Sequence, residues 1–210
     1  MVQTTHTGDN SSKLDEIIKA AQKQFGMYGL KKTSMIDIAK DLNMSKGLLY
    51  YYFPDKEHLY KAVVEKEIHE FEVKVDKELH PMDNPSEKLK QYMRIRLSYF
   101  RSLLNLSRFR LDEMQNINSF MKDTWKSARE FEKGIIIEIL EKGNEIKLFN
   151  VEDSEDTADL LFDLLRGVRM SMIKDKQLFY LEQEEFALLV KRSETLVDLL
   201  LQGLIRREQL

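Results

Sequence analysis

The chain of 210 residues carries 33 basic and 36 acidic side chains, is 42% hydrophobic and 33% charged, and contains no cysteine. This composition is apolar enough for a folded core, and it excludes disulfide frameworks, zinc ribbons, iron–sulfur clusters and cysteine nucleophiles. Only 3 prolines and 8 glycines interrupt a chain rich in helix-forming residues, so we expect an all-α fold.

Residues 1–12 are polar and are expected to form a disordered N-terminal tail. They lack the cationic start and apolar run of a secretory signal, and no later run approaches the roughly 18 apolar residues of a membrane span. We therefore expect a cytoplasmic protein with no membrane partner. Residues 1–61 carry 9 Lys against 7 acidic residues, a local charge of +2, although the whole chain has a net charge of −3. This uneven distribution of charge along the chain permits a contact between the N-terminal region and DNA.

Apolar residues at spacings of three and four predict four helices in the N-terminal part of the chain. Gly29 is expected to stop the first helix. Ser34, Ser45 and Asp55 carry side-chain oxygens suited to cap the next three. The predicted helices span 13–27, 34–42, 45–52 and 55–79.

The remainder of the chain is also predicted to be helical. Pro81 and Pro85 break the chain before this region, and the segment 142–153, which contains Gly143, is expected to be a loop. The predicted helices span 86–107, 111–141 with a break near 117–121, 154–175 and 183–207.

The two short helices over 34–42 and 45–52 match the helix-turn-helix arrangement, in which the second helix enters the major groove of DNA. Leu49 and Phe53 are four residues apart and are expected to anchor this helix inward. A run of tyrosines packs in a core more often than it contacts DNA. However, three successive helix positions sweep about 200° and cannot share one buried face. At least one of Tyr50, Tyr51 and Tyr52 must therefore face outward.

Six elements of this region occur in a family-specific order: Phe25 with Gly29, Thr33-Ser34, Ile38-Ala39, Ser45-Lys46-Gly47, Leu49-Tyr50-Tyr51-Tyr52-Phe53, and Lys56 with Leu59. The series resembles the N-terminal signature of the tetracycline-repressor (TetR/AcrR) family of bacterial transcription regulators and covers residues 13–60. The family usually carries His where Tyr52 stands. The resemblance implies a DNA-binding domain over 13–60, in which Thr33 and Ser34 hold phosphate and Lys56 pairs with backbone phosphate. It assigns the groove-facing set to Ser45, Lys46, Gly47, Tyr50, Tyr51 and Tyr52.

The resemblance also implies a larger helical domain over 61–210 that binds a small-molecule effector and dimerises through the last two long helices. Both of these helices carry apolar residues around more than one face, which supports a helix-bundle interface. A homodimer would place two recognition helices about 34 Å apart on an inverted-repeat operator. The long helix 55–79 joins the two domains and is the expected lever between effector and DNA.

The candidate ligand-binding residues are aromatic, Met and Arg side chains of the larger domain, although such side chains fill interiors more often than they line cavities. Arg166 and Arg169 interrupt an otherwise apolar helix. A buried guanidinium requires an anionic partner, which is either Asp163 or the ligand. The candidates are Tyr92, Arg96, Tyr99, Phe100, Met114, Met121, Trp125, Phe162, Arg166, Arg169 and Met170.

The sequence therefore predicts a DNA-binding transcriptional regulator, a repressor released from a palindromic operator by a small molecule. The four histidines lack metal-ligand spacing and no glycine-rich phosphate loop is present, so no metal, cofactor or enzyme activity is expected. Two alternatives remain open: a helical protein-interaction scaffold without specific DNA binding, and a small all-α enzyme with its site in the larger domain.

Overall fold

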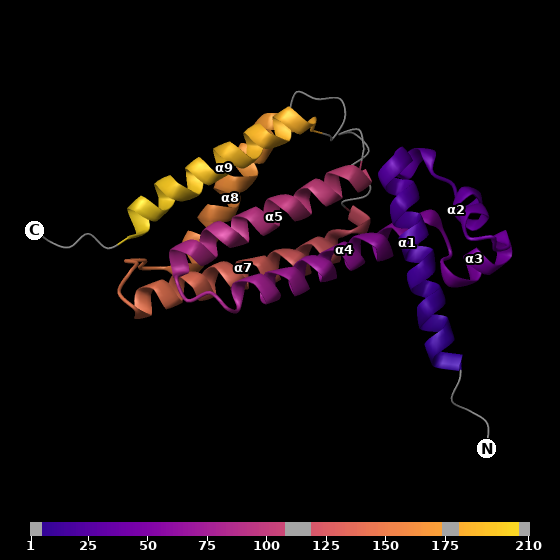
Figure 1. Cartoon of the computed structure of the whole chain (residues 1–210), viewed down its shortest axis with the longest axis horizontal. Coiled ribbons are helices and arrows are strands. Elements are labelled where there is room, and N and C mark those ends of the chain that lie inside the picture. The colour runs from indigo at the N-terminus through magenta and orange to yellow at the C-terminus, as the bar shows by residue number, and fades with distance from the viewer. Residues whose placement is uncertain (1–5, 108–118, 174–180, 206–210) are drawn as a thin grey trace, which may run out of the picture.

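The computed structural model describes residues 6–107, 119–173 and 181–205. A helix-turn-helix lies at one end and a larger helical domain at the other, joined by α4 (Figure 1), which confirms the predicted all-α fold class. Within the described ranges, no helix is both long enough and apolar enough to span a membrane. The helices are α1 (His6–Lys32), α2 (Met35–Asp41), α3 (Lys46–Tyr52), α4 (Lys56–Leu79), α5 (Pro85–Ser107), α7 (Lys122–Glu145), α8 (Ser154–Ile173) and α9 (Gln183–Leu204).

The first helix differs from its prediction at both ends. It begins at His6 rather than near Lys13, so the expected disordered tail over 1–12 is wrong for residues 6–12; residues 1–5 lie outside the described chain. No proline falls between residues 6 and 13, so nothing blocks extension of the helix. At Gly29 the backbone leaves the helical conformation, with φ 78 and ψ 164, before one more turn ends at Lys32. This positive φ explains why a glycine stands at the kink.

The predicted N-caps of the three following helices are confirmed. The side chains of Ser34, Ser45 and Asp55 each accept a hydrogen bond from the backbone amide three residues later, at 3.2, 3.2 and 2.8 Å. Each cap satisfies one of the amides that a helix start leaves unpaired. The caps therefore fix where α2, α3 and α4 begin.

The predicted break between α4 and α5 is confirmed, with α4 ending at Leu79 and α5 beginning at Pro85. Proline suits the first helical position, because the amide that it lacks has no partner there. The side chain of Asn84 accepts hydrogen bonds from the amides of Ser86 and Glu87 at 2.9 and 3.2 Å. The break therefore reverses the chain and starts α5 with a complete cap.

The loop after α7 requires glycine at position 143. A Cβ atom built on Gly143 would lie 1.9 Å from the ring of Phe149, which is 2% exposed. The ring therefore packs directly on the helix backbone. The amide of Asn150 donates to the carbonyl of Leu204 at 2.9 Å, which ties this loop to the end of α9.

Two hydrophobic cores divide along α4. Leu59, Val63 and Ile68 belong to the N-terminal core with α1, α2 and α3, whereas Phe71 and Val75 belong to the core of the larger domain. The change from one core to the other thus falls beyond residue 60, where the DNA-binding domain was expected to end. α4 is shared by both domains.

Candidate nucleic-acid interface and effector site

Helix α3 is anchored to the N-terminal core by the side chains on its inward side. Leu49 is fully buried and Phe53 is 8% exposed, and both belong to the N-terminal core, as the sequence predicted. Because these two side chains fix the rotation of α3 about its axis, the opposite side of the helix faces away from the protein.

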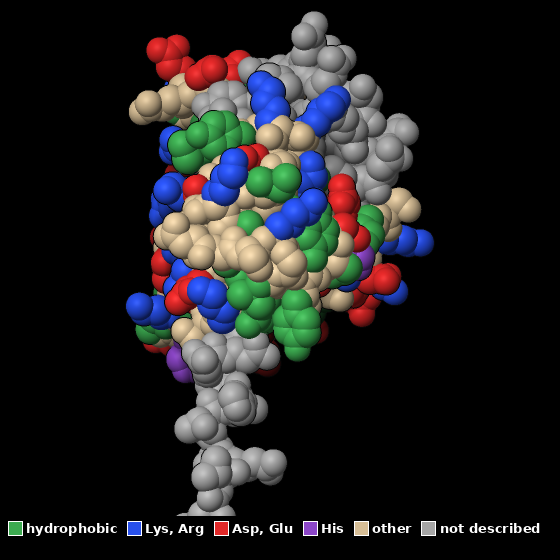
Figure 2. Space-filling model, turned by 90° about the vertical axis from the view of Figure 1, so that its right-hand side faces the viewer, with side chains coloured by type: hydrophobic (Ala, Val, Ile, Leu, Met, Phe, Trp, Pro, Cys, Tyr) green, Lys and Arg blue, Asp and Glu red, His purple; other side chains and the backbone are tan. Residues whose placement is uncertain are grey.

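The outward side of α3 carries a charged side chain, exposed tyrosine rings and a stretch of accessible backbone. Lys46 and Gly47 are exposed, and Tyr50 and Tyr51 are 40% and 79% exposed. The ammonium of Lys46 lies 5.4 Å from the ring centroid of Tyr50. No atom lies within 4 Å of a Cβ built on Gly47, so another molecule can approach the helix closely there. Figure 2 shows this end of the molecule, with Lys and Arg side chains interspersed among hydrophobic ones.

Tyr52 lies differently from the two tyrosines before it. Its side chain is half-buried and packs against the N-terminal core, and its ring meets that of Tyr51 edge-on with centroids 5.5 Å apart. Tyr52 therefore supports Tyr51 from the protein side. The outward set on α3 is smaller than predicted.

Ser34 opens α2 beside this surface. Its hydroxyl accepts from the amide of Asp37 and donates to the carboxylate of the same residue at 2.5 Å. The side chain is half-buried, so part of its surface is accessible at the start of α2.

The structure corrects the prediction made for Thr33. Its side chain is 2% exposed, and its hydroxyl donates to the carbonyls of Gly29 and Gln24, at 2.9 and 3.2 Å. The kink at Gly29 turns these carbonyls toward the hydroxyl, which closes the α1–α2 corner. The predicted phosphate contact of the Thr33 side chain is therefore wrong.

Lys56 is half-buried, and its ammonium donates to the carbonyl of Thr33 at 3.1 Å. It thereby ties the start of α4 to the start of α2. The neighbouring Asp55 carboxylate has a lowered pKa because it accepts the backbone amide of His58, with the His58 side chain adding to the effect. An ammonium bound to one carbonyl retains two N–H donors, so Lys56 keeps the means to bind a phosphate.

Two exposed apolar residues of this surface were not predicted as site residues. Ile36 on α2 is 45% exposed and Leu48 on α3 is 43% exposed. Both fall outside the buried stripes of their helices. An apolar residue outside the buried stripe was the sequence signal that could have identified them as surface contacts. Exposed methyl groups beside tyrosines suit contact with thymine methyls.

Three of the predicted effector residues meet in the larger domain. The hydroxyl of Tyr92 and the Nε of Arg96, both on α5, donate to the same oxygen of Glu132 on α7, each at 2.6 Å. The guanidinium of Arg96 also lies over the ring of Phe162 on α8, 4.9 Å from its centroid. Arg96 and Glu132 are 14% and 12% exposed, so the pair is nearly buried.

The surroundings shift the pKa values of this cluster. Burial, followed by the charge of Glu132, raises the pKa of the Tyr92 phenol well above its usual range. Burial lowers the pKa of the Arg96 guanidinium, but Glu132 and Tyr92 outweigh it and the net pKa is raised. The cluster therefore holds a neutral phenol and a firmly charged ion pair.

Other predicted effector residues make different contacts. Met121 is fully buried in the N-terminal core, and Trp125 packs against that core. The Tyr99 ring stacks on Phe71 with centroids 4.6 Å apart. Met114 lies outside the described residues.

The structure differs from the prediction at Arg166 and Met170, because both are exposed on α8, whereas Arg169 is half-buried. The guanidinium of Arg169 lies over the ring of Phe100, 4.6 Å from its centroid. Asp163, the internal acid considered for these arginines, is itself exposed. Arg169 thus lies half-buried beside the buried stripe of α8, and Arg166 lies in solvent.

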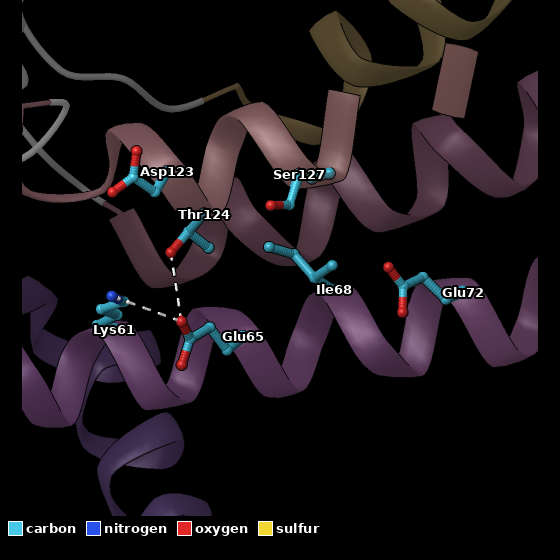
Figure 3. Close-up of a pocket in the computed structure, with 8 residues that line it drawn as sticks. Lys61, Glu65, Ile68, Glu72, Asp123, Thr124 and Ser127 are labelled. Atoms are coloured by element: carbon cyan, nitrogen blue, oxygen red, sulfur yellow. Dashed lines mark hydrogen bonds and ion pairs between the residues drawn. The ribbon is translucent and has the colours of Figure 1, made fainter. Parts of the chain in front are cut away.

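A groove of about 270 Å³ lies between α4 and α7, and none of the predicted effector residues lines it. Glu65 on α4 faces Thr124 on α7 across the groove, with a hydrogen bond of 3.3 Å, and Lys61 reaches the same carboxylate at 3.8 Å (Figure 3). These contacts join the domain-spanning helix to the first turns of α7. In the part of the chain that the structure describes, no group of three or more His, Asp or Glu side chains could hold a metal ion.

Comparison with known proteins places this geometry in a family. A family model for bacterial regulatory proteins of the tetR family matches residues 17–63, from α1 into α4. The chain is similar over most of its length to the crystal structure of a transcriptional regulator from Cytophaga hutchinsonii ATCC 33406. It shares 35% sequence identity with a TM-score of 0.83, and the match covers 92% of this chain and 99% of that one.

Two curated relatives match shorter regions. The HTH-type transcriptional regulator RutR of Escherichia coli K12 is 34% identical over 104 residues, which is 50% of this chain and 49% of RutR. The chain thus spans about half the length of the curated relative it matches. The probable acrEF/envCD operon repressor of the same strain is 35% identical over 48 residues, covering 23% of this chain and 22% of that protein.

Proposed function

The chain belongs to the TetR family of bacterial regulatory proteins, and from this premise we propose that it is a DNA-binding transcriptional regulator. In this proposal a homodimer binds an inverted-repeat operator as a repressor, and a small-molecule effector releases it. The observation that carries the proposal is the outward side of α3, where Lys46, Gly47, Tyr50 and Tyr51 stand exposed on an inwardly anchored helix.

This surface suits the major groove of B-DNA, which admits one α-helix. Lys46 brings charge, and the phenols of Tyr50 and Tyr51 offer hydroxyls to phosphates and ring surface to thymine methyls. Ser34 and Lys56 flank α3 and are assigned to backbone phosphates. The relative named as a probable operon repressor supports repression, rather than activation, of transcription.

Exposed apolar residues on the last two helices support a dimer. Leu160 on α8 is 54% exposed and lies two turns before the exposed Gly167. On α9, Leu188 and Leu199 are 41% and 59% exposed and lie three turns apart. Because α8 and α9 pack against each other, these residues are assigned to one apolar surface that a second copy would cover.

The path between effector and DNA runs through α4 and the start of α7. Met121 and Trp125 pack on the N-terminal core although α7 belongs to the larger domain. The ring of Phe120, just before α7, meets that of His58 on α4 with centroids 5.2 Å apart. A ligand that shifts α4 or α7 would therefore move the recognition helices. Release needs only a ligand that prefers the conformation with the wrong half-site separation.

The proposal assigns no enzymatic activity and places the protein with its DNA partner in the bacterial cytoplasm. The matched relatives are named as transcriptional regulators or a repressor, which agrees with the absence of a catalytic assignment.

Selection of bound duplexes from a random DNA pool by the full-length protein tests the proposal. We expect enrichment of an inverted repeat, with binding weakened in Lys46→Ala and Tyr50→Ala. Lys142→Ala is the matched control, because Lys142 lies near the far end of α7 (Figure 1), away from α3.

If no motif is enriched at low salt, the selection is repeated with protein that has been unfolded and refolded to remove any bound effector. A second failure would refute the proposal and favour the scaffold alternative.

A further inference from the structure

Helices α5 and α8 of the larger domain exchange a reciprocal pair of contacts. Arg96 on α5 lies over Phe162 on α8 at 4.9 Å, and Arg169 on α8 lies over Phe100 on α5 at 4.6 Å. Tyr92, Arg96 and Phe100 follow one another at intervals of four residues and share one side of α5. The two guanidiniums therefore lie in one apolar region between the helices.

The two arginines differ in how their charge is balanced. Arg96 has the carboxylate of Glu132 at 2.6 Å. The Nε of Arg169 is buried and has no hydrogen-bond partner, and no ion pair to Arg169 is found among the described residues. A ring face attracts a cation but offers no acceptor in the plane of the guanidinium, so Phe100 does not satisfy the Nε–H.

The surroundings of Arg169 disfavour its charged form. Burial, and then repulsion by Arg96, lowers the pKa of Arg169 to about 10, with Arg166 adding to the repulsion and Glu132 opposing it. Arg96, Arg169 and Glu132 together carry one excess positive charge. A buried cation without a partner is costly, and natural proteins rarely keep one without a use for it.

A second polar group on α5 also lacks a partner. The hydroxyl of Tyr99 is buried without a hydrogen bond, and its ring stacks on Phe71. Burial, and then the charge of Glu132, raises the pKa of the Tyr99 phenol, and Glu132 also acts on the pKa of Arg169. Each of the two unsatisfied donors lies beside an aromatic ring.

We propose that the effector is an organic carboxylate with an apolar body, and that Arg169 binds its carboxylate group between α5 and α8. The rings of Phe100 and Phe162 supply the apolar surroundings, and the Tyr99 hydroxyl is the second donor. This inference rests on the proposed effector-responsive function and assigns the chemical class of the ligand.

The test measures binding of a probe series to the full-length protein by calorimetry and thermal shift. The probes are acetate, butanoate, hexanoate, octanoate, decanoate, benzoate and phenylacetate, each beside the alcohol of the same carbon skeleton. We expect at least one carboxylate to bind roughly tenfold or more tightly than its alcohol, because a charged hydrogen bond is lost in the alcohol. Carboxylates that bind no better than their alcohols, or a series in which none binds, would overturn the proposal.

Arg169→Met and Arg166→Met form the matched pair of variants. Both remove one arginine from α8, but Arg166 is exposed, whereas Arg169 is half-buried and its Nε is buried. We expect Arg169→Met to raise the melting temperature without probe by about 2 °C or more, because it removes an uncompensated buried charge. The same variant should weaken carboxylate binding by roughly tenfold to a hundredfold, whereas Arg166→Met leaves it unchanged.

Arg169→Lys retains the charge without the planar fork and should bind carboxylate with intermediate affinity, which keeps the test valid if Arg169→Met fails to fold. Equal carboxylate affinity in Arg169→Met and the wild type would overturn the proposal. Binding of the selected duplex without probe separates failure of the ligand class from failure of the proposed function. If the wild type binds DNA but binds none of the carboxylates, only the ligand class is refuted. If it binds no DNA, the proposed function is refuted.

Discussion

Removing the charge of Glu132 should destabilise the larger domain strongly. Its carboxylate accepts both the Tyr92 hydroxyl and the Arg96 Nε at 2.6 Å and is 12% exposed. Glu132→Gln keeps the shape of the side chain but leaves Arg96 without an anionic partner, beside the unpaired Arg169. Breaking a buried ion pair from one side costs about 3–5 kcal/mol. For a chain of this size, that loss lowers the melting temperature by about 6–20 °C.

The measurement is urea denaturation at a fixed protomer concentration, because dimerisation makes apparent stability concentration-dependent. Adding Arg96→Met to Glu132→Gln should recover part of the loss, since it removes the stranded cation. Glu145→Gln is the control: Glu145 pairs with Lys142 at the surface, where both side chains are more than half exposed, and it should change nothing measurable. A loss below about 1 kcal/mol for Glu132→Gln, or further destabilisation on adding Arg96→Met, would refute the reasoning.

Three further predictions test other parts of the molecule. Thr33→Val should lower the free energy of unfolding by about 1–3 kcal/mol in urea denaturation, since it removes a buried donor, and should leave the affinity for the selected duplex unchanged in fluorescence anisotropy. The pKa of Asp15 is lowered from 3.8 to about 2 by hydrogen bonds from Lys19 and Lys66, so its contribution to stability is present above pH 3.8 and is lost as the pH falls toward 2. Asp15→Asn should therefore show a shallower loss of stability over that interval in denaturation at stepped pH. Leu199→Glu, at a position 59% exposed on α9, should shift sedimentation from dimer to monomer while the helical circular dichroism is retained.

The parts of the fold that the sequence could predict depend on short-range interactions. The caps at Ser34, Ser45 and Asp55 each bond an amide three residues ahead, so residue type and spacing suffice to find them. The inward anchoring of α3 by Leu49 and Phe53 follows from helical periodicity in the same way.

The features that the sequence could not predict depend on contacts between distant segments. The Thr33 hydroxyl is buried because the kink at Gly29 presents carbonyls to it, and the sequence does not specify the direction of that turn. The partner of Arg96 is Glu132, 36 residues away on another helix. Arg166 and Arg169 lie one turn apart on α8, and only the packing of α5 against this helix decides which of them is buried.

The role of α3 in reading DNA is tested most directly by titrating the selected duplex at several salt concentrations with the wild type and Lys46→Ala. Affinity should fall steeply with salt in the wild type. If each Lys46 neutralises one phosphate charge, the slope of log affinity against log salt should be shallower by about 2 in the variant dimer. Identical slopes in the two proteins, or equal affinity for the selected duplex and for random DNA, would contradict the assignment of α3 as the recognition helix.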